Sequence, residues 1–509
     1  MAPNTKAFRL AIAASALTLL FAACCTARQL KQAPDTTYLL TFSGSPTRGS
    51  VNSAIARAGC APDFFDADAG RRRHGSVALS LTTPGFAEVG INLVSKDVAF
   101  PPADDDDKPT KGRGVDEEPA PTATPTPTSF FSGPITDTSQ IDDPFWPRQW
   151  APKAIGAPAA WAKGINGRCV RVAVVDSIFG PPHNDLKKKF DYNVSRGFGN
   201  IDWTWNSTNP VGTYVAGIIG AEAKNNDAIV GVAYGSTLIG LNTMDANGYY
   251  WASKVAQAII FAAKRKAEGC AGADVIHAKF AATWDRANET QRTENGTSNN
   301  AMAYLNKAIS SANRNGVLVV VPAGQAVWPG SGIDLTYQKS NFTGLCENAN
   351  VLCVGAYGAT GLCKGGCAPN NVICNSPLDV AGANYSQLHP MANYGRSVDV
   401  AGPAGVLDNY PGACHSTNAI FSTGRYNIRV YSSEPFMASP HAAALAALYI
   451  QKAAMDKGIL ESELCNPART RTIIKTAIKR GAVMPPGNAA ELKKYFGNGY
   501  INVPNTLGL

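Results

Sequence analysis

A carboxylate, an imidazole and a hydroxyl held together can carry out nucleophilic catalysis, because the imidazole takes the hydroxyl proton and the carboxylate orients the imidazole. Asp176 follows an apolar run at residues 170–175, and Ser432, Ser433 and Ser439 lie in one C-terminal stretch. The six histidines of the chain are His74, His183, His277, His389, His415 and His441. Whether these groups meet depends on the elements that carry them.

From about residue 145 onward, apolar runs alternate with helical patterns. The expected strands are residues 170–176, 238–243, 274–280, 317–323, 351–356 and 398–401, and the expected helices are residues 251–267, 300–313 and 437–452. Nearly continuous apolar runs are typical of strands buried on both faces of a parallel sheet. The pattern therefore predicts an α/β fold, a three-layer sandwich with a mainly parallel central sheet. Catalytic side chains in such folds lie at the carboxyl ends of strands and at helix starts.

The first 27 residues predict an export signal. Lys6 and Arg9 precede an apolar run at residues 10–23, and small residues allow cleavage after Ala27. The alternative is a membrane anchor, although the run is short for a span. No other segment is long and apolar enough to cross a bilayer, so no span is expected after signal removal.

Two further regions precede the main domain, which we place at residues 145–509. Residues 28–100 predict a small α+β unit, with strand-like alternation at residues 37–42 and 89–100 and a helical pattern at residues 51–58. Residues 101–144 contain an acidic run and a Pro/Thr-rich stretch that cannot bury a core, so they predict an extended linker.

Cysteines and glycosylation sequons favour a secreted protein. Twelve cysteines less Cys24 and Cys25 in the signal leave ten, most of which should pair in an oxidising compartment. Cys363, Cys367 and Cys374 lack the paired spacing of a zinc site, so disulfides are expected. The Asn-x-Ser/Thr sequons begin at Asn193, Asn206, Asn288, Asn295, Asn341 and Asn384. A formal charge of +8 without a basic stripe excludes nucleic acid as the expected partner.

Three motifs in order resemble those of the subtilisin-like serine proteases (subtilases, peptidase family S8). Residues 170–176 resemble the strand that ends in the catalytic Asp. Residues 211–217, Val-Gly-Thr-Tyr-Val-Ala-Gly, resemble His-Gly-Thr-His-Val-Ala-Gly, and residues 434–441, Glu-Pro-Phe-Met-Ala-Ser-Pro-His, resemble Gly-Thr-Ser-Met-Ala-Ser-Pro-His. Supporting likenesses fall at residues 225–233, 317–325 and 392–401, and residues 37–100 resemble the inhibitory prodomain. The resemblance covers about residues 145–480 and implies the subtilisin-like sandwich.

The resemblance also assigns catalytic positions, and most of them are altered. Asp176 keeps the triad carboxylate. Val211 stands at the imidazole position and Phe436 at the nucleophile position, and neither side chain can transfer a proton. Gln325 stands at the oxyanion position, where its longer amide would aim differently. Lys279 begins a stretch, residues 279–282, where the family has Ser-Leu-Gly-Gly, and the change is expected to crowd a bound peptide.

The sequence thus indicates a secreted homologue of a subtilisin-like endopeptidase that is an inactive pseudoprotease. It would bind a protein or peptide ligand or serve as an extracellular structural glycoprotein. The alternative is an active endopeptidase with a rearranged site. His183 and His441 match structural positions of the family, and His277 is expected to be a satisfied core residue. No cofactor is implied except a structural calcium ion at the loop of residues 225–227, for which the sequence shows no carboxylate cluster.

Overall fold

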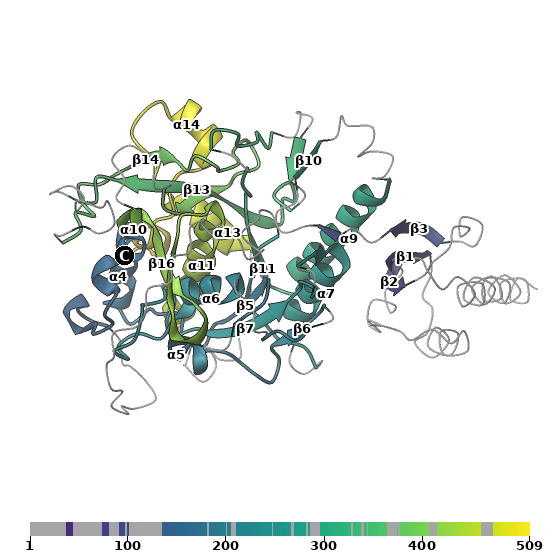
Figure 1. Cartoon of the computed structure of the whole chain (residues 1–509), viewed down its shortest axis with the longest axis horizontal. Helices are drawn as coiled ribbons and strands as arrows, with labels where there is room; N and C mark the ends of the chain where they lie inside the picture. Colours follow the sequence, from purple (N-terminus) through teal and green to yellow (C-terminus); the bar gives the residue numbers. More distant parts are fainter. Residues whose placement is uncertain are drawn as a thin grey trace, which may run out of the picture. The chain divides into compact units, whose positions relative to one another are not determined.

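The computed structural model describes residues 37–43, 74–80, 91–96 and 99–100, and then residues 135–509 (Figure 1). The gaps in the last range are residues 181–182, 200, 205–209, 247, 266–268, 281–282, 286–295, 327–328, 337–340, 344, 364–373, 375–376, 407–414 and 460–471. The predicted signal, the predicted helix at residues 51–58 and most of the predicted linker lie outside the described residues. So do the sequons at Asn206, Asn288 and Asn295.

The chain divides into two compact units. One contains residues Met1–Ala99 and Asn288–Leu305, and the other contains the rest. In the first unit β1 (Thr37–Ser43) is the central strand of an antiparallel sheet, between β2 (His74–Ser80) and β3 (Ile91–Lys96). The strand-like alternation at residues 37–42 and 89–100 is thus confirmed as strand, the second with β4 (Ala99–Phe100) at its end.

A mainly parallel sheet forms the centre of the second unit. Its order is β14-β13-β11-β9-β5-β7-β6, with β15 also paired to β13, and only the β13–β14 pair is antiparallel. The strands are β5 (Arg171–Asp176), β6 (Arg196–Gly197), β7 (Thr237–Asn242), β9 (Val275–Ala278), β11 (Leu318–Pro322), β13 (Val351–Thr360), β14 (Asn384–Leu388) and β15 (Val400–Pro403). The six predicted strands are confirmed within a few residues, which confirms the α/β class.

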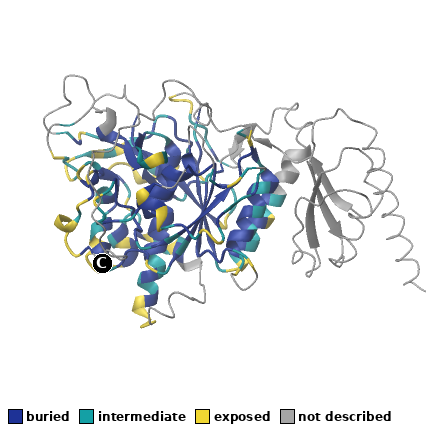
Figure 2. Cartoon of the chain, turned by 60° about the horizontal axis from the view of Figure 1, so that its bottom comes forward, coloured by how far each residue is buried: buried dark blue, intermediate teal, exposed yellow. Residues whose placement is uncertain are grey.

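Helices cover both faces of this sheet. Helix α6 (Val211–Gly220) and helix α11 (Ala438–Asp456) pack against each other over one face. On the other face lie α7 (Ala252–Ala263) and the end of α9 (Gly296–Arg314), whose residues 306–314 belong to the second unit (Figure 1). Figure 2 shows the strands and the inner sides of these helices as buried. This arrangement confirms the three-layer sandwich, and burial of the apolar strands between two helix layers is its main source of stability.

The remaining elements are short. They are α3 (Trp150–Ala154), α4 (Ala157–Trp161), α5 (Asn184–Lys187), β8 (Tyr250–Trp251), β10 (Thr283–Asp285), β12 (Asn341–Thr343), α10 (His415–Asn418), β16 (Ile420–Thr423), β17 (Arg429–Ser432), α13 (Thr472–Gly481), α14 (Ala489–Phe496) and α15 (Val503–Leu507). Strands β16 and β17 pair as a hairpin beside α6. None of the helices in the described part of the chain is both long and apolar enough to span a membrane.

Among the described residues of the second unit, disulfides join Cys346 to Cys353 and Cys363 to Cys374, and Cys169 is also disulfide-bonded. The first joins the loop before β13 to the strand itself. The expectation of disulfides in place of a zinc site is confirmed for these four cysteines, Cys363 and Cys374 among them.

The order of the strands contains one topological switch. From β5 the chain passes through α6 to β7 on one side, and from β7 it crosses through α7 to β9 on the other side of β5. Ligands of open α/β sheets bind where such a switch opens a crevice at the carboxyl ends of the strands. Asp176 ends β5 and Lys279 directly follows β9, so the site is expected at these two residues.

Candidate functional site

Asp176 is the last residue of β5 and is completely buried. Its Oδ1 accepts a hydrogen bond from the Ser177 backbone N at 2.6 Å, and its own carbonyl accepts one from the Thr243 N at 3.0 Å. The strand pairing and these bonds fix the carboxyl at the edge of the sheet where the switch occurs. The role of Asp176 as a triad carboxylate stays a prediction.

Val211 begins α6 and is 2% exposed. The next residue, Gly212, donates its backbone N–H to the Ser177 Oγ at 3.3 Å. The start of α6 therefore lies beside the residue that follows Asp176, as the resemblance implies for an imidazole next to its carboxylate. The isopropyl group of Val211 occupies this place with no atom that can accept or donate a proton.

Phe436 lies in a short 3-10 helix, Pro435–Met437, directly before α11. Its ring is 8% exposed, and the Lys279 Nζ lies 4.1 Å from the ring centroid. A cation over an aromatic face is attracted by the ring quadrupole, by about 1 kcal/mol or more when partly desolvated. The predicted nucleophile position is thus filled by an aromatic ring that an ammonium group covers.

Gln325 follows β11 and turns its amide toward the same segment. Its Nε2 donates to the Glu434 Oε2 at 2.7 Å, so the charged carboxylate receives this donor. The sequence predictions gave Glu434 no role. The sequence did carry a sign of the special role of Glu434, because the motif that this segment resembles has glycine at this position. The neighbour of Asp176, Ser177, thus contacts the start of α6. Gln325 contacts Glu434, which lies two residues before Phe436, and Lys279 contacts the Phe436 ring.

A hydroxyl and an imidazole meet behind the Phe436 segment. The His277 Nε2 lies 2.8 Å from the Ser439 Oγ, and the Ser439 hydroxyl donates to the Phe436 carbonyl at 3.0 Å. With its proton directed to that carbonyl, the hydroxyl must accept from His277, so the imidazole acts as the donor. Both side chains are fully buried, and burial together with Lys279 lowers the pKa of His277 to about 3. His277 is a core residue, as predicted, but it is only partly satisfied, because its Nδ1 has no hydrogen-bond partner among the described residues.

Three other described histidines form hydrogen bonds with backbone groups. The His441 Nδ1 donates to the Met437 carbonyl at 2.8 Å, and the His389 ring contacts the Ser433 carbonyl. The His183 Nδ1 accepts from the Asp185 N at 3.1 Å and caps α5. Burial lowers the pKa of each of these three imidazoles to about 4. The side chains of His74 and His415 lie outside the described residues.

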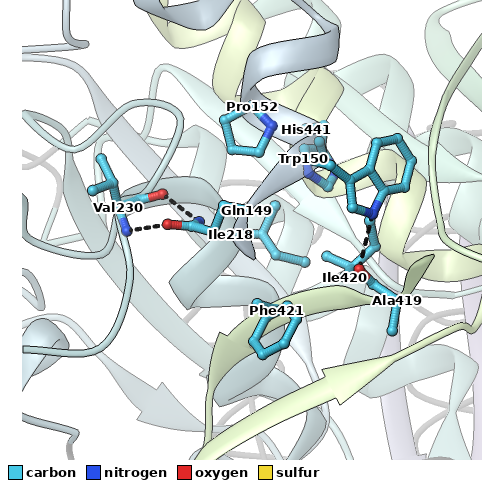
Figure 3. A pocket seen from close by; sticks show the side chains of 10 residues that line it. Gln149, Trp150, Pro152, Ile218, Val230, Ala419, Ile420, Phe421 and His441 are labelled. Atoms are coloured by element: carbon cyan, nitrogen blue, oxygen red, sulfur yellow. Dashed lines mark hydrogen bonds between the residues drawn. The ribbon is translucent and has the colours of Figure 1, made fainter. Parts of the chain in front are cut away.

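A small pocket beside α11 contains no catalytic geometry (Figure 3). The Gln149 amide makes two hydrogen bonds to the Val230 backbone, at 2.8 and 3.0 Å, and the Trp150 Nε1 donates to the Ala419 carbonyl at 2.9 Å. His441 lies at the rim, and the cavity volume is about 10 Å³, roughly the room for one water molecule. These bonds fix residues 149–150 to the loop before β7 and to the residue that precedes β16.

The loop predicted to bind calcium lies beside a cluster of His183, Asp185 and Asp227, whose possible ligand atoms are within 4.8 Å of one another. Asp185 is distant in sequence from the loop, so the sequence alone did not reveal the cluster. The Asp185 oxygens accept hydrogen bonds from the Asn225 Nδ2 at 2.9 Å and from the Ile229 N at 3.0 Å. Burial of Asp185, and to a smaller extent the negative charge of Asp227, raises the pKa of Asp185. Calcium takes six to eight oxygen ligands. An imidazole and a carboxylate that faces N–H groups do not fit it as arranged, and calcium binding here stays a prediction.

Comparisons with known proteins show the family of the chain. A sequence model described as "Subtilase family" matches residues 167–499. The chain is 28% identical over 363 residues to the thermophilic serine proteinase of Bacillus sp. (strain AK1), covering 70% of this chain and 67% of that protein. It is 34% identical over 140 residues to halolysin of Haloferax mediterranei, covering 27% of this chain and 26% of halolysin.

A solved structure supports the same fold. The epidermin leader peptide processing serine protease of Staphylococcus aureus superposes with a TM-score of 0.60 at 16% identity, covering 94% of this chain and 99% of that one. At this identity the likeness concerns the fold alone.

Proposed function

Because this chain belongs to the subtilase family, we propose that its subtilisin-like domain is a pseudoprotease, which keeps the protease fold without the reaction and acts outside the cell by binding a protein or peptide. The proposal rests on the residue types at three positions and on their contacts. Export rests on the predicted signal and the sequons.

The observation that supports it most is the environment of Phe436. Acyl transfer needs a hydroxyl or thiol at the nucleophile position and room for an acyl group beside it. Here a ring fills the position, the Lys279 ammonium lies over it at 4.1 Å, and the neighbouring Glu434 accepts from the Gln325 amide at 2.7 Å. The amide that would have donated to an oxyanion instead faces a negative charge.

The size of the loss also supports inactivity. Removing single triad members costs serine proteases several orders of magnitude, and the remaining acceleration, about 10³–10⁴-fold over water, comes from substrate binding and the oxyanion hole. In this chain the imidazole and the nucleophile are both replaced, and the oxyanion donor is redirected. With valine at residue 211, Asp176 has no imidazole at that position to orient.

The alternative function is an active endopeptidase with a rearranged site. Ser439 and His277 supply a hydroxyl and an imidazole in contact, but both are fully buried and the imidazole acts as the donor. A substrate carbonyl would have to displace core side chains to reach the hydroxyl. The pair therefore favours the pseudoprotease.

Labelling with a serine-directed phosphonate tests the proposal. The purified full chain should react no faster than heat-denatured protein, and it should cleave no fluorogenic peptide under conditions in which an active subtilase does. Labelling of Ser432, Ser433 or Ser439 above the denatured rate, located by mass spectrometry, would show a working nucleophile and overturn the proposal.

Charge-reversal variants test binding at the Phe436 segment as the function. Glu434→Lys reverses a charge that the Gln325 amide contacts, and Glu491→Lys makes the same change on the exposed face of α14. Extracellular proteins captured and cross-linked by the wild type should be lost with Glu434→Lys and kept with Glu491→Lys. Equal capture by both variants would show that these proteins do not bind at Glu434. A chain that stays in the insoluble matrix until salt extraction would instead favour a structural glycoprotein.

A further inference from the structure

A second cavity lies at the opposite ends of the strands from the altered catalytic positions. Strands β9, β11 and β13 run parallel, and the candidate site lies at their carboxyl ends. The cavity lies at their amino ends. Its lining comes from the end of α9, the start of β11, the turn before β13, α13 and one residue after α14 (Figure 1): Asn313, Val317, Leu318, Ala349, Asn350, Lys475, Thr476, Lys479, Arg480 and Asn498.

The cavity is large enough for a small molecule, and its lining is positively charged. Its volume is about 500 Å³, within the range of small-molecule sites. Lys475, Lys479 and Arg480 all line it, and none of its described lining residues is acidic. Because three cations share one concave surface, the cavity attracts anions more strongly than a flat surface with the same charges would.

One partly buried carboxylate beside the lining offsets part of this charge. Asp399 pairs with the Lys475 Nζ and the Lys479 Nζ, both at 2.8 Å. Lys475 also donates to the Ala349 and Val351 carbonyls, at 3.1 and 2.5 Å, so its three N–H donors are engaged. Three cations less one carboxylate leave a charge of about +2 at the cavity.

The remaining donors belong to two neighbouring residues of α13. Lys479 gives one N–H to Asp399, which leaves two for a ligand. Arg480 is exposed and has no ion pair with any described residue, so its planar fork of N–H donors is available. A guanidinium binds phosphate or carboxylate through two parallel hydrogen bonds, and an adjacent ammonium adds a point charge. Asn350 contributes an amide at the same wall.

We propose that this cavity binds a small anion with two or more negative charges, held by Arg480 and Lys479 and carrying phosphoryl or carboxylate groups. The site is independent of the proposed pseudoprotease function, since it lies across the sheet from Phe436. A ligand here would stabilise the folded domain whether or not the cleft is occupied.

Calorimetric titration of the purified full chain tests the site. The probes are pyrophosphate and citrate, each at constant ionic strength, with chloride as the blank. One saturable site is expected for at least one probe, and preference for either shows whether phosphoryl or carboxylate groups are recognised. Arg480→Gln should weaken binding about tenfold or more, the effect of losing a charge-assisted hydrogen bond.

Two further variants make the test specific. Lys479→Gln should weaken binding similarly, although it also removes an ion pair with Asp399, whereas Arg480→Gln removes no described ion pair and should leave the melting temperature unchanged. Lys493→Gln, an exposed lysine of α14, makes the same charge change away from the cavity and should bind as the wild type does. Absence of saturable binding by both probes, or an equal loss with Lys493→Gln, overturns the proposal.

Discussion

Phe436 is a core residue as well as the residue at the predicted nucleophile position. Its ring is 8% exposed, belongs to the main hydrophobic cluster and carries Lys279 on one face. A side chain so placed contributes to stability through its buried area and its packing. The ring that stands at the predicted nucleophile position therefore also stabilises the fold.

Phe436→Ser is expected to destabilise the protein and to restore no activity. Truncation of a buried phenylalanine costs about 3 kcal/mol or more, and the new hydroxyl has no imidazole beside it while Val211 is present. Denaturant unfolding and phosphonate labelling measure the two effects. Phe436→Leu, which keeps most of the apolar volume, is the control and should cost clearly less. Labelling of the new serine at the rate of an active protease would contradict this account.

Ser439→Ala should destabilise the fold by about 2 kcal/mol, because the buried His277 Nε2–H would lose its acceptor. The matched control is Ser236→Ala. Ser236 is 1% exposed, and its Oγ has no hydrogen-bond partner among the described residues, so its loss should be near neutral. Chemical denaturation of both variants decides the point, and equal effects would show that the His277 contact adds nothing.

The residue scale also shows how far the sequence could lead. The motif register predicted which residues stand at the catalytic positions, since motifs align residue by residue. It did not predict that Lys279 would cover Phe436 or that Gln325 would bind Glu434, because these contacts join segments that follow different strands. Only the folded backbone brings such segments together.

Helix α6 shows how closely the elements around the site pack. The Ser422 Oγ donates to the Tyr214 carbonyl at 2.5 Å and the Thr423 Oγ1 donates to the Thr213 carbonyl at 3.0 Å, which ties α6 to β16. A β-carbon added at Gly217 would meet the Thr423 Oγ1 at 2.3 Å. Glycine at this position allows the hairpin to approach the helix.

Gly217→Ala should therefore destabilise the domain by about 1–3 kcal/mol, in spite of the better helix propensity of alanine. Gly220→Ala is the control in the same helix. Its added carbon would meet the nearest atom, the Ser236 Oγ, at 3.0 Å, so a smaller loss is expected. Thermal melting of the two variants compares them, and a Gly217→Ala variant at least as stable as the wild type would refute close packing here.

At the element scale, prediction from the sequence succeeded where burial is continuous. Strands β5, β11 and β13 are apolar over their whole length, and their runs were found within a few residues. The β16–β17 hairpin was not predicted. Its strands have four residues each, and its turn holds Tyr426 and Asn427 at φ of 49° and 63°, where a hairpin sequence commonly has glycine.

At the scale of the whole molecule, buried histidines should make stability depend on pH. In the unfolded chain an imidazole gains its proton near pH 6.5, whereas in the folded chain four of them stay neutral to about pH 4 or below: His183, His277, His389 and His441. Between these values the unfolded state binds up to four more protons. This contribution lowers stability as the pH falls.

Two carboxyls act in the opposite direction. Burial raises the pKa of Asp143 to about 7 and that of Asp185 well above its ordinary value, so the folded state gains up to two protons that the unfolded state gains only near pH 3.8. Four less two leaves about two protons taken up on unfolding. Stability should therefore fall by about 2–3 kcal/mol per pH unit between roughly pH 6 and pH 4.5.

Denaturant unfolding across this pH range measures the slope. His441→Asn removes one of the four imidazoles and should reduce the proton uptake on unfolding by about one. Ser236→Ala, which changes no ionisable group, should keep the wild-type slope. Stability that rises steadily from pH 6.5 to pH 5 would contradict the balance of charges.

Residues 135–150 are held in the second unit, and the chain before them contains the region where a cut would release residues 28–100. Ile135 is 1% exposed and its N–H donates to the Tyr234 hydroxyl at 3.1 Å, and Trp150 is bonded to the Ala419 carbonyl. If the domain is a pseudoprotease, it cannot separate itself from residues 28–100. Protein made in a protease-deficient host should stay one chain after signal removal. Mass spectrometry tests this, and a stoichiometric cut between residues 90 and 145 that persists with broad inhibitors would mean self-processing.

The lysine-capped ring at Phe436 has a consequence for the evolution of this chain. A single mutation back to serine removes core volume and leaves Lys279 without its aromatic partner, and a single mutation of Val211 to histidine places a polar ring at a site that is 2% exposed. Each first step lowers stability before any catalysis can reward it. If the domain is a pseudoprotease, this packing acts against a return to proteolysis, because selection for activity would have to pass through at least one destabilised single mutant.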